Sequence, residues 1–331
     1  MSGVSDPGRG WRAIALSRRI GRRPLRVLVD GVPLVLFRGT DGTIAALHDR
    51  CPHRHAPLSG GRVVDGAIEC PYHGWRFAPG GRLLAIPCHT GEVPRIAVPK
   101  VAVCEAEGIV FAGGGAETPY ACCASGPDTI AMRMENRVRS TVIDVAENIL
   151  DATHTHFTHK GLLRGLSSKR YRVAVTVSAG PDWVEAVYEG EPRQEGLVSR
   201  LLEGQRGKGV ARFLAPGIAE LEFWGKTRLN LATTFHLRQE SAETVHGVAI
   251  LAGPRQGGLG HIKAALLRPF FTVALRQDQT ILEASRDNAA LFGDPAPATG
   301  PLDILRQSIA EIMAARPPAL AGRSVRHEMD L

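Results

Sequence analysis

The sequence predicts two successive domains of different class, a small all-β domain followed by an α+β domain with an antiparallel sheet. Up to about residue 115, short strand-like runs are separated by turn dipeptides such as Asp30-Gly31 and Asp65-Gly66. Beyond that point, longer alternating segments stand between helix-like ones, an order that favours an α+β fold. With 331 residues, 44% of them hydrophobic, the chain is long enough for two cores.

The first domain is predicted from its turns. Residues 25–29 and 32–37 flank Asp30-Gly31 and predict a hairpin, and Pro33 suggests that its second strand lies at a sheet edge. Further short strands are expected at 44–47 and 109–111. The run Gly113-Gly114-Gly115 before Pro119 predicts a linker. The expected domains are therefore residues 1–116 and 117–331.

The second domain is predicted from longer patterns. Helices are expected at residues 142–153, 272–292 and 302–315, where helix formers predominate. Alternating apolar and polar residues predict strands at 171–177, 184–188, 220–224, 229–237 and 245–251. Strands in series with helices before and after them suggest one antiparallel sheet with helices on it.

Composition excludes several classes of protein. Six cysteines in a chain of this length do not form a disulfide framework, and Cys88, Cys104, Cys122 and Cys123 are interpreted as reduced thiols without an assigned role. No apolar run approaches the roughly 20 residues of a membrane span. The N-terminus lacks the pattern of a secretory signal. The expected location is the cytoplasm.

Positive charge is concentrated at the start of the chain. Residues 1–82 contain 13 arginines and six acidic residues, so they carry the whole net charge of +7. No helix-turn-helix, zinc-finger or aromatic RNA-binding pattern accompanies this charge, so nucleic acid is not an expected partner. An acidic protein that docks on this domain would account for the asymmetry, and so would a basic face that is merely solvated.

The first candidate metal site is the set Cys51-x-His53 and Cys70-x-x-His73. Each loop supplies one thiolate and one imidazole, a donor set that suits a [2Fe-2S] cluster with two cysteines on one iron and two histidines on the other. Zinc is the competing ligand, because two cysteines and two histidines also close a tetrahedral zinc site. The Cys-x-His spacing and the flanking strands argue against a zinc finger.

These loops resemble a known family. The segments CPHRHAPLSGG and CPYHGWRFAPGG are similar to the two cluster-binding loops of Rieske domains, and the similarity covers residues 11–112. Matching loop residues that would shape and shield the cluster are Pro52, Pro71, Gly74 and Trp75. His55 replaces the small residue of many relatives and is interpreted as a surface histidine, since the ligand set is already complete.

A second candidate site follows the linker, in Asn148-x-x-Asp151-x-x-His154-x-x-x-x-His159. On an ideal helix the two histidines would lie about 140° apart, so both can bind one metal only if the helix ends or bends between them. Lys160-Gly161 supports an end just afterwards.

The segment ENILDATHTHFTH resembles the mononuclear-iron motif of Rieske oxygenases. The resemblance implies that His154 and His159 are imidazole ligands of Fe(II), that Asp151 is a bridging carboxylate, and that Asp151 and Asn148 are the catalytic residues. His156 matches no ligand position.

A facial triad needs one carboxylate beside its two histidines. The sequence RQDQTILEAS places Asp278 where the family has an acidic ligand on a late helix, so Asp278 is the predicted third ligand. Glu283 and Asp287 lie on the same predicted helix and remain alternatives.

The resemblance also implies an assembly and a set of partners. Family members take electrons from NAD(P)H through a reductase or ferredoxin, and their subunits form a head-to-tail ring, usually a trimer. Asp151 would hydrogen-bond His154 of its own chain and His73 of the next. The catalytic domain would have an α+β helix-grip (START-like) fold.

The reaction is less defined than the class. The compact catalytic domain is similar to that of α-only monooxygenases and demethylases, which predicts hydroxylation or oxidative demethylation with O2. Residues 185–204 and 212–223 show a looser similarity to relatives acting on bulky alicyclic or aromatic molecules, sterols included. The alternatives are a ring cis-dihydroxylating dioxygenase, an electron carrier with a degenerate second domain, and a non-enzymatic binder of hydrophobic ligands.

Overall fold

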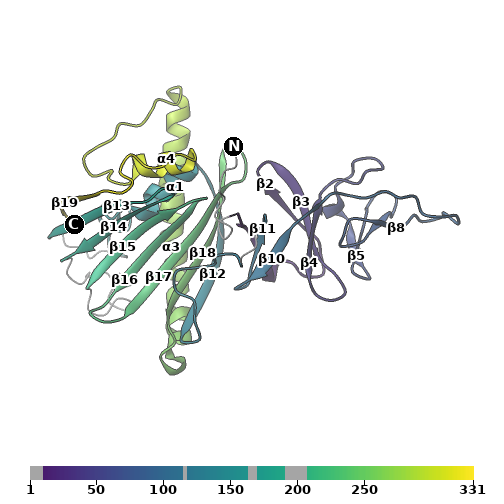
Figure 1. The fold of residues 1–331 in the computed structure, drawn as a ribbon, viewed down its shortest axis with the longest axis horizontal. Coiled ribbons are helices and arrows are strands. Elements are labelled where there is room, and N and C mark those ends of the chain that lie inside the picture. Colours follow the sequence, from purple (N-terminus) through teal and green to yellow (C-terminus); the bar gives the residue numbers. More distant parts are fainter. Residues whose placement is uncertain (1–9, 115–117, 163–169, 191–206) are drawn as a thin grey trace. The chain divides into compact units, whose positions relative to one another are not determined.

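The computed structural model describes residues 10–114, 118–162, 170–190 and 207–331, and the chain forms two compact units (Figure 1). The first unit is Met1–Ala121 with Glu240–Ala242, and the second is Cys122–Gln239 with Glu243–Leu331. The boundary predicted at residue 116 lies among residues 115–117, outside the described residues, and stays a prediction. Within the described residues no helix is long and apolar enough to cross a membrane.

The first unit consists of three small antiparallel sheets. In spatial order, the first sheet contains β1 (Arg12–Leu16), β11 (Ile109–Ala112) and β10 (Val103–Ala106). The second contains β2 (Leu25–Val29), β3 (Val32–Arg38), β4 (Ile44–His48) and β9 (Lys100–Val101). The third contains β5 (Arg62–Val64), β6 (Ala67–Glu69), β7 (Arg76–Phe77) and β8 (Leu83–Ala85). Short 3-10 turns lie at Ser17–Arg19 and Leu58–Gly60. The predicted all-β class is confirmed.

The hairpin predicted at Asp30-Gly31 is confirmed. Both turn residues have positive φ, 49° and 78°, which gives the tight turn that suits the twist of two strands. The edge position suggested by Pro33 is wrong, because β3 lies between β2 and β4. The pairing of β3 with β4 ends at Leu34, one residue after Pro33. The N–H that proline lacks would therefore not have made a backbone hydrogen bond between these two strands.

Strand β3 separates two small cores in this unit. Its alternating side chains place Val35 and Phe37 in one cluster and Leu34 and Leu36 in the other, all at most 1% exposed. The first cluster also contains the thiols of Cys51 and Cys70, so the two cysteine loops are anchored on its apolar packing. Each such buried apolar side chain contributes roughly 1.5–3 kcal/mol by leaving water.

The second unit is built on one eight-stranded antiparallel sheet. Its spatial order is β12 (Thr129–Arg139), β18 (Thr244–Pro254), β17 (Leu229–Gln239), β16 (Ile218–Trp224), β15 (Lys208–Leu214), β14 (Trp183–Glu189), β13 (Arg172–Ala179) and β19 (Ser324–Asp330). The α+β class with an antiparallel sheet is confirmed. Three of these strands, β12, β15 and β19, were not predicted.

Among the described residues, three helices cover one face of this sheet (Figure 1): α1 (Val142–Leu150), α3 (Leu259–Leu291) and α4 (Arg306–Met313). The buried residues of α1 recur at helical spacing, and Val142, Ala146 and Leu150 pack with Phe213 in the sheet core. Leu282 of α3 contacts the same core. The helices thus pack on the sheet through separate apolar clusters, one under α1 and α4 and another around Leu267 of α3.

The ends of α1 and α3 determine where the second candidate site lies. The Thr141 hydroxyl caps α1 by accepting a hydrogen bond from Asp144 N (3.2 Å), and α1 ends at Leu150 rather than at residue 153 as predicted. A separate 3-10 turn, His154–His156, follows. Helix α3 begins at Leu259 instead of residue 272 and continues through Pro269.

Candidate metal centres

The two cysteine loops of the first unit have the same backbone fold. In each, the cysteine N–H donates to the carbonyl five residues on, and the cysteine carbonyl accepts from the N–H four residues on. These bonds run from Cys51 N to Ala56 O (2.9 Å), His55 N to Cys51 O (2.8 Å), Cys70 N to Trp75 O (2.8 Å) and Gly74 N to Cys70 O (3.1 Å). Two turns with equivalent backbone hydrogen bonds therefore each present one cysteine and one histidine, with the histidine two residues after Cys51 and three residues after Cys70.

The four predicted cluster ligands lie together in this unit. The rings of His53 and His73 have centroids 4.6 Å apart, and His53 stacks on Trp75 at 4.6 Å with 7° between the planes. The thiols of Cys51 and Cys70 are buried, whereas His73 is exposed. The imidazole side of the site therefore faces solvent and the thiol side faces the core.

The chemical state of these donors fits a metal centre. Burial raises the pKa of the Cys51 thiol to about 11, and the neighbouring Cys70 contributes to this shift, so a bound cation is needed to hold Cys51 as a thiolate. Burial, His73 and Arg54 lower the pKa of His53, which keeps its ring neutral. Nδ1 of His53 is buried and lacks a hydrogen-bond partner among the described residues.

The spacing of the donors argues against zinc. Donors bound to one tetrahedral zinc ion lie about 3.4–3.8 Å apart, given bonds of about 2.1–2.3 Å. Among the described residues only two groups of three or more possible ligand atoms lie within 4.8 Å of one another, and neither includes a residue of these loops. The four donors of these loops are thus spread more widely than ligands of one zinc ion. A cluster with two irons, one bound by the two cysteines and the other by the two histidines, fits this spacing better.

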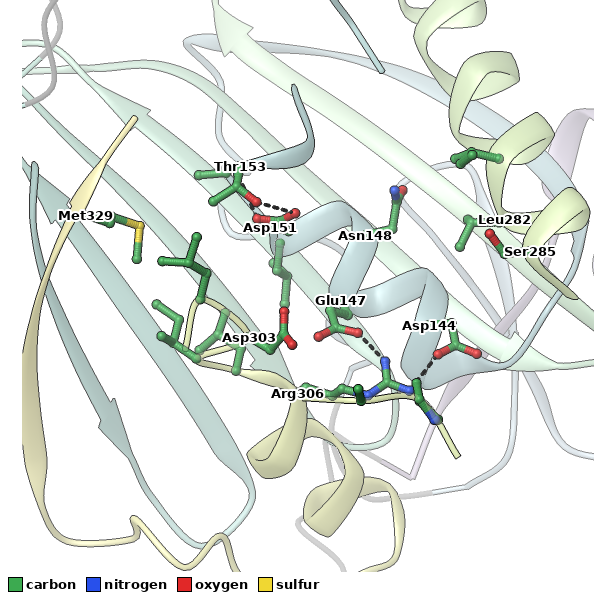
Figure 2. A pocket seen from close by; sticks show the side chains of 18 of the residues that line it. Asp144, Glu147, Asn148, Asp151, Thr153, Leu282, Ser285, Asp303, Arg306 and Met329 are labelled. Atoms are coloured by element: carbon green, nitrogen blue, oxygen red, sulfur yellow. Dashed lines mark hydrogen bonds and ion pairs between the residues drawn. The ribbon is translucent and has the colours of Figure 1, made fainter. Parts of the chain in front are cut away.

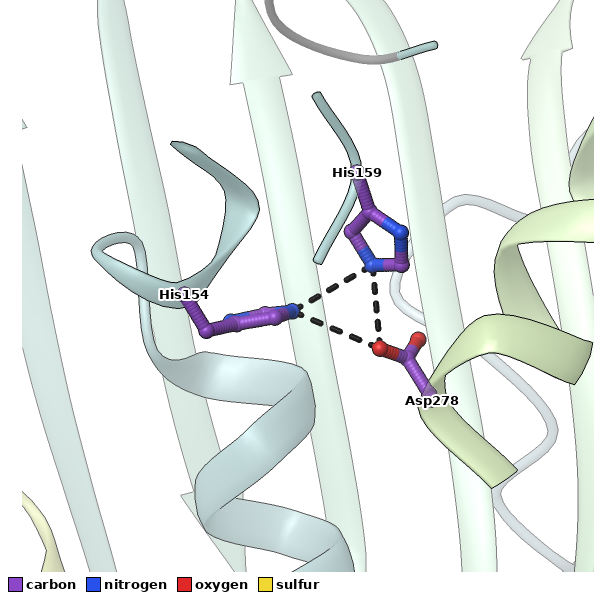
Figure 3. Close-up of side chains that lie close together, drawn as sticks. All are labelled: His154, His159 and Asp278. Carbon is purple, nitrogen blue, oxygen red and sulfur yellow. Dashed lines mark hydrogen bonds and ion pairs between the residues drawn. The ribbon is translucent and has the colours of Figure 1, made fainter. Parts of the chain in front are cut away.

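The second candidate site, in the other unit, brings His154, His159 and Asp278 together (Figure 3). Oδ1 of Asp278 lies 3.0 Å from Nε2 of His159 and 3.5 Å from Nε2 of His154, and the two Nε2 atoms are 3.3 Å apart. Ligands about 2.1 Å from a common ion are about 3.0 Å apart at right angles and about 3.4 Å apart at tetrahedral angles. The three atoms thus have the spacing of ligands around one ion.

The triad is enclosed and electrostatically suited to a cation. The side chain of His159 is only 2% exposed, and Asp278 Oδ1 is buried without a hydrogen-bond partner of acceptable geometry among the described residues. Burial would raise the pKa of Asp278, but His154 and His159 lower it instead, so the carboxylate is ionised. Burial also opposes protonation of His154, but Asp151 and Asp278 raise its pKa to about 9.

Asp151 supports His154 in a different way from the one predicted. Nδ1 of His154 donates to the backbone carbonyl of Asp151 (2.8 Å), whereas the Asp151 carboxylate lies 3.6 Å from that nitrogen. The carboxylate instead accepts hydrogen bonds from the N–H of Thr153 (2.6 Å), the N–H of His154 (3.0 Å) and the Thr153 hydroxyl (3.0 Å). These bonds hold the turn that carries His154. Burial would raise the pKa of Asp151, but the His154 side chain and the hydrogen bonds from Thr153 lower it instead.

Asn148 lies in the wall of a cavity of about 400 Å³ (Figure 2). The cavity is lined by the carboxyl end of α1, by Leu282 and Ser285 of α3 and by the C-terminal segment. Asp151 lines the same cavity. On the α1 side, Arg306 is joined to Asp144 (2.9 Å) and to Glu147.

The alternative ligands and bystanders lie outside the triad. Asp287 is bound by Arg139 (2.7 Å), and Glu283 accepts hydrogen bonds from Arg139 N (3.2 Å) and Gln279 (2.9 Å). Neither His55 nor His156 belongs to a group of possible ligand atoms in the described part of the chain. Of the three carboxylates considered, Asp278 is the one that lies in a described group with His154 and His159.

One further cluster was not predicted. Cys123, Glu220 and Glu222 have possible ligand atoms within 4.8 Å of one another. Arg212 contacts both carboxylates, at 3.2 and 3.3 Å, and also Glu185 at 2.6 Å, so one positive charge is shared among three carboxylates. Burial and Glu220 raise the pKa of the Cys123 thiol to about 12, so it stays protonated. This cluster is explained as a cross-strand ion network.

Comparison with known proteins defines the class. Residues 10–102 match the family model of the Rieske [2Fe-2S] domain. The chain is 31% identical over 158 residues to the oxygenase component of dicamba O-demethylase from Stenotrophomonas maltophilia, covering 45% of this chain and 47% of that protein. It is 28% identical over 235 residues to the chloroplastic protein TIC 55 of Arabidopsis thaliana, covering 65% of this chain and 41% of that protein. The chain thus spans less than half the length of these curated relatives.

A likeness to solved structures extends over both units. Dicamba monooxygenase bound to 3,6-dichlorosalicylic acid has a TM-score of 0.77 and 22% identity, with 94% of this chain and 97% of that chain covered. A structure of the same enzyme with non-haem iron and dicamba has a TM-score of 0.72. The shared fold is thereby shown. The chain carries a Rieske [2Fe-2S] domain and is homologous to Rieske oxygenase components.

Proposed function

We propose that this chain is the oxygenase component of a multicomponent Rieske non-haem iron system. It would use O2, and electrons that originate from NAD(P)H and arrive through a reductase or ferredoxin, to hydroxylate or oxidatively demethylate a hydrophobic small molecule. The observation that carries the proposal is the convergence of His154, His159 and Asp278 in a chain that also has a Rieske domain. A pure electron carrier would have no need of this second set of ligands.

The residues of the two sites have distinct roles in this proposal. Cys51, Cys70, His53 and His73 would hold the [2Fe-2S] cluster, and His154, His159 and Asp278 would hold Fe(II). When bound, the cluster would supply single electrons and the ferrous iron would offer open positions to dioxygen. Asp278 contributes the one negative charge of its ligand set, and the low exposure of His159 keeps bulk water from that side.

We further propose that the chain forms a head-to-tail ring, a trimer, in which Asp151 links His154 to His73 of a neighbouring copy. Three donors of its own chain occupy the Asp151 carboxylate, which has about four acceptor sites. Its side chain is 29% exposed and lines the 400 Å³ cavity, so a further donor can reach it. His73 is exposed and stacks against Tyr72, itself 63% exposed, as expected of a docking surface.

The electron donor is proposed to be an acidic protein. The 13 arginines of residues 1–82 make the cluster domain strongly basic, and complementary charge would steer an acidic ferredoxin or reductase to it. The substrate is proposed to be an alicyclic or aromatic molecule. The aromatic content of 5% supports a mainly aliphatic pocket. Residues 191–204 of the predicted substrate-related segment 185–204 lie outside the described residues.

The test is oxygen consumption by the iron-loaded chain with NADH or NADPH and a surrogate reductase, over a panel of hydrophobic substrates. Substrate-dependent oxygen uptake, with a product heavier by one oxygen or lighter by a methylene group, supports the proposal. A product heavier by two oxygens and two hydrogens would identify a cis-dihydroxylating dioxygenase. Tight ligand binding without oxygen uptake would favour the binder, and reduction of another protein would favour the carrier.

A further inference from the structure

His159 is held at both ring nitrogens by two consecutive residues of α3. Its Nδ1 lies 2.8 Å from Oε1 of Gln277, and its Nε2 lies 3.0 Å from Oδ1 of Asp278. Both contacts come from one helix, which packs on the same sheet face as α1. The ring therefore has little freedom to rotate, because α3 holds it at both nitrogens.

The contact with Gln277 determines which nitrogen carries the proton. An amide oxygen can only accept a hydrogen bond, so Nδ1 of His159 must be the protonated nitrogen of the neutral ring. The lone pair is then on Nε2, the atom that faces Asp278 and His154. Without a partner at Nδ1, the ring could adopt the opposite tautomer, with a hydrogen on the nitrogen that must bind the ion.

The two histidines of the triad are fixed by different groups. Nδ1 of His154 donates to the backbone carbonyl of Asp151, which no side-chain substitution removes. Nδ1 of His159 depends on a side chain, Gln277, and that side chain is a neutral amide. The amide orients the ring without adding a second negative charge to the carboxylate of Asp278.

We propose that Gln277 is a positioning residue for the mononuclear site, which holds His159 in the tautomer and ring orientation that bind the metal. This inference rests on the proposed function, because it takes His159 as an iron ligand. Partners that orient a metal-binding histidine typically change metal affinity by 10–100-fold when they are removed. Gln277 is expected to act through His159 in this way.

The chain offers a matched control on the same helix. Gln279 is also an amide of α3, and its Nε2 donates to Glu283 at 2.9 Å, with Asn136 at 3.5 Å from its oxygen. It makes no contact with the triad in the described structure. Substitution at Gln279 therefore controls for the loss of an amide from α3.

The test measures metal affinity rather than turnover. The full chain, with its cluster intact and its mononuclear metal removed, is titrated with Co(II), and binding is followed by the ligand-field absorption of the metal. Gln277→Ala should weaken binding by about 10–100-fold. Gln277→Glu, which restores an acceptor, should recover affinity to at least the wild-type value with a shifted spectrum, and Gln279→Ala should bind as wild type. Unchanged far-ultraviolet circular dichroism and an unchanged thermal unfolding transition confirm that the second unit of each variant is folded, and unchanged cluster absorption confirms the same for the first.

A further variant, His159→Ala, distinguishes a failure of the inference about Gln277 from a failure of the proposed ligand set. If His159→Ala loses Co(II) but Gln277→Ala binds it with wild-type affinity and an unchanged spectrum, the positioning role is refuted and the proposed ligand set stands. If His159→Ala itself binds Co(II) as wild type, the ligand set of the proposed function is refuted, and the inference about Gln277 falls with it. Equal losses in Gln277→Ala and Gln279→Ala would also overturn the inference, because they would indicate a general effect on α3.

Discussion

His55 and Gly74 occupy the same position in the two cysteine loops, and both have a left-handed backbone, with φ of 59° and 71°. In each case the N–H of the residue closes the turn onto the carbonyl of the cysteine four residues earlier. Glycine adopts this conformation without strain, whereas for a residue with a Cβ the conformation costs roughly 1–2 kcal/mol. The unusual His55 is therefore a residue tolerated at a glycine-like position.

This equivalence predicts opposite effects of two substitutions. His55→Gly should stabilise the first unit by about 0.5–1 kcal/mol, because the relief of strain exceeds the extra flexibility of glycine in the unfolded chain. Gly74→Ala should destabilise it by about 2 kcal/mol or more, since its Cβ would also lie 2.8 Å from Cγ of Pro87. Denaturant unfolding of the full chain, followed by the visible absorption of the cluster, measures both. Stabilisation by Gly74→Ala would contradict the argument.

Glu69 predicts a pH dependence next to the second loop. It lies opposite Arg62 on β5 and Arg76 on β7, with Oε1 and Oε2 each 2.7 Å from a guanidinium nitrogen. Hydrogen bonds from Arg76 and Arg62 lower the pKa of Glu69 below its usual value, against burial. Because the folded-state pKa is below the unfolded value of about 4.3, the ion pairs contribute stability above that pH and lose it as the pH falls through the folded pKa.

Glu69→Gln should therefore be less stable than wild type at pH 7 by about 1 kcal/mol, since cross-strand pairs that are partly exposed are weak. The difference should vanish in acid, once Glu69 is protonated. Unfolding free energies measured from pH 7 down to the acid limit of stability test this. A difference that stays constant over the whole range would assign the effect to packing rather than to charge.

Sequence reasoning succeeded where the chemistry is local and failed where it spans the chain. Cys51 to His53, Cys70 to His73 and His154 to His159 are short spacings, so one segment suffices to propose each pair. Gln277 binds a histidine 118 residues away, and nothing in its neighbourhood distinguishes it from other helix amides. The support of His154 by a backbone carbonyl has no sequence signal, since every residue has that group.

The same contrast applies to the fold. Strand β13 was expected from its alternation of apolar and polar residues, which matches its buried and exposed positions. Strand β19, at the edge of the same sheet, has mostly exposed and polar side chains, so its sequence SVRHEMD has no apolar pattern to detect. Its place is set by pairing with β13, an interaction between distant segments. The early start of α3 was missed because Pro269 lies inside the helix.

Asp278 is predicted to be essential for the mononuclear metal but not for the cluster. Asp278→Ala should lose the mononuclear iron, because two neutral imidazoles alone do not supply the carboxylate of a facial triad. The visible absorption of the cluster should persist, since the four predicted cluster ligands belong to the other unit. Iron content and absorption spectra measure the two centres separately.

The two alternative carboxylates provide the controls for Asp278. Asp287→Ala removes only an exposed pair with Arg139 and should leave the stability close to that of wild type. Glu283→Ala removes the acceptor of Gln279 and of the Arg139 N–H. Both should retain mononuclear iron. Loss of that iron in either control, with retention in Asp278→Ala, would move the third ligand to the other position.

Asp151→Asn is predicted to separate iron binding from turnover. The carbonyl that orients His154 belongs to the backbone and is unaffected, and the amide oxygen of asparagine can still accept one of the N–H bonds of the turn. Both metal centres should therefore load. The amide lacks the charge and the second acceptor oxygen that would bridge to His73 of a neighbouring copy, so substrate-dependent oxygen uptake should fall by about 100-fold.

Thr153→Val is the control, because it removes only the hydrogen bond from the Thr153 hydroxyl to Asp151, at 3.0 Å, and it should retain most of the activity. If Asp151→Asn keeps its iron and turns over as wild type, electrons do not pass through this residue.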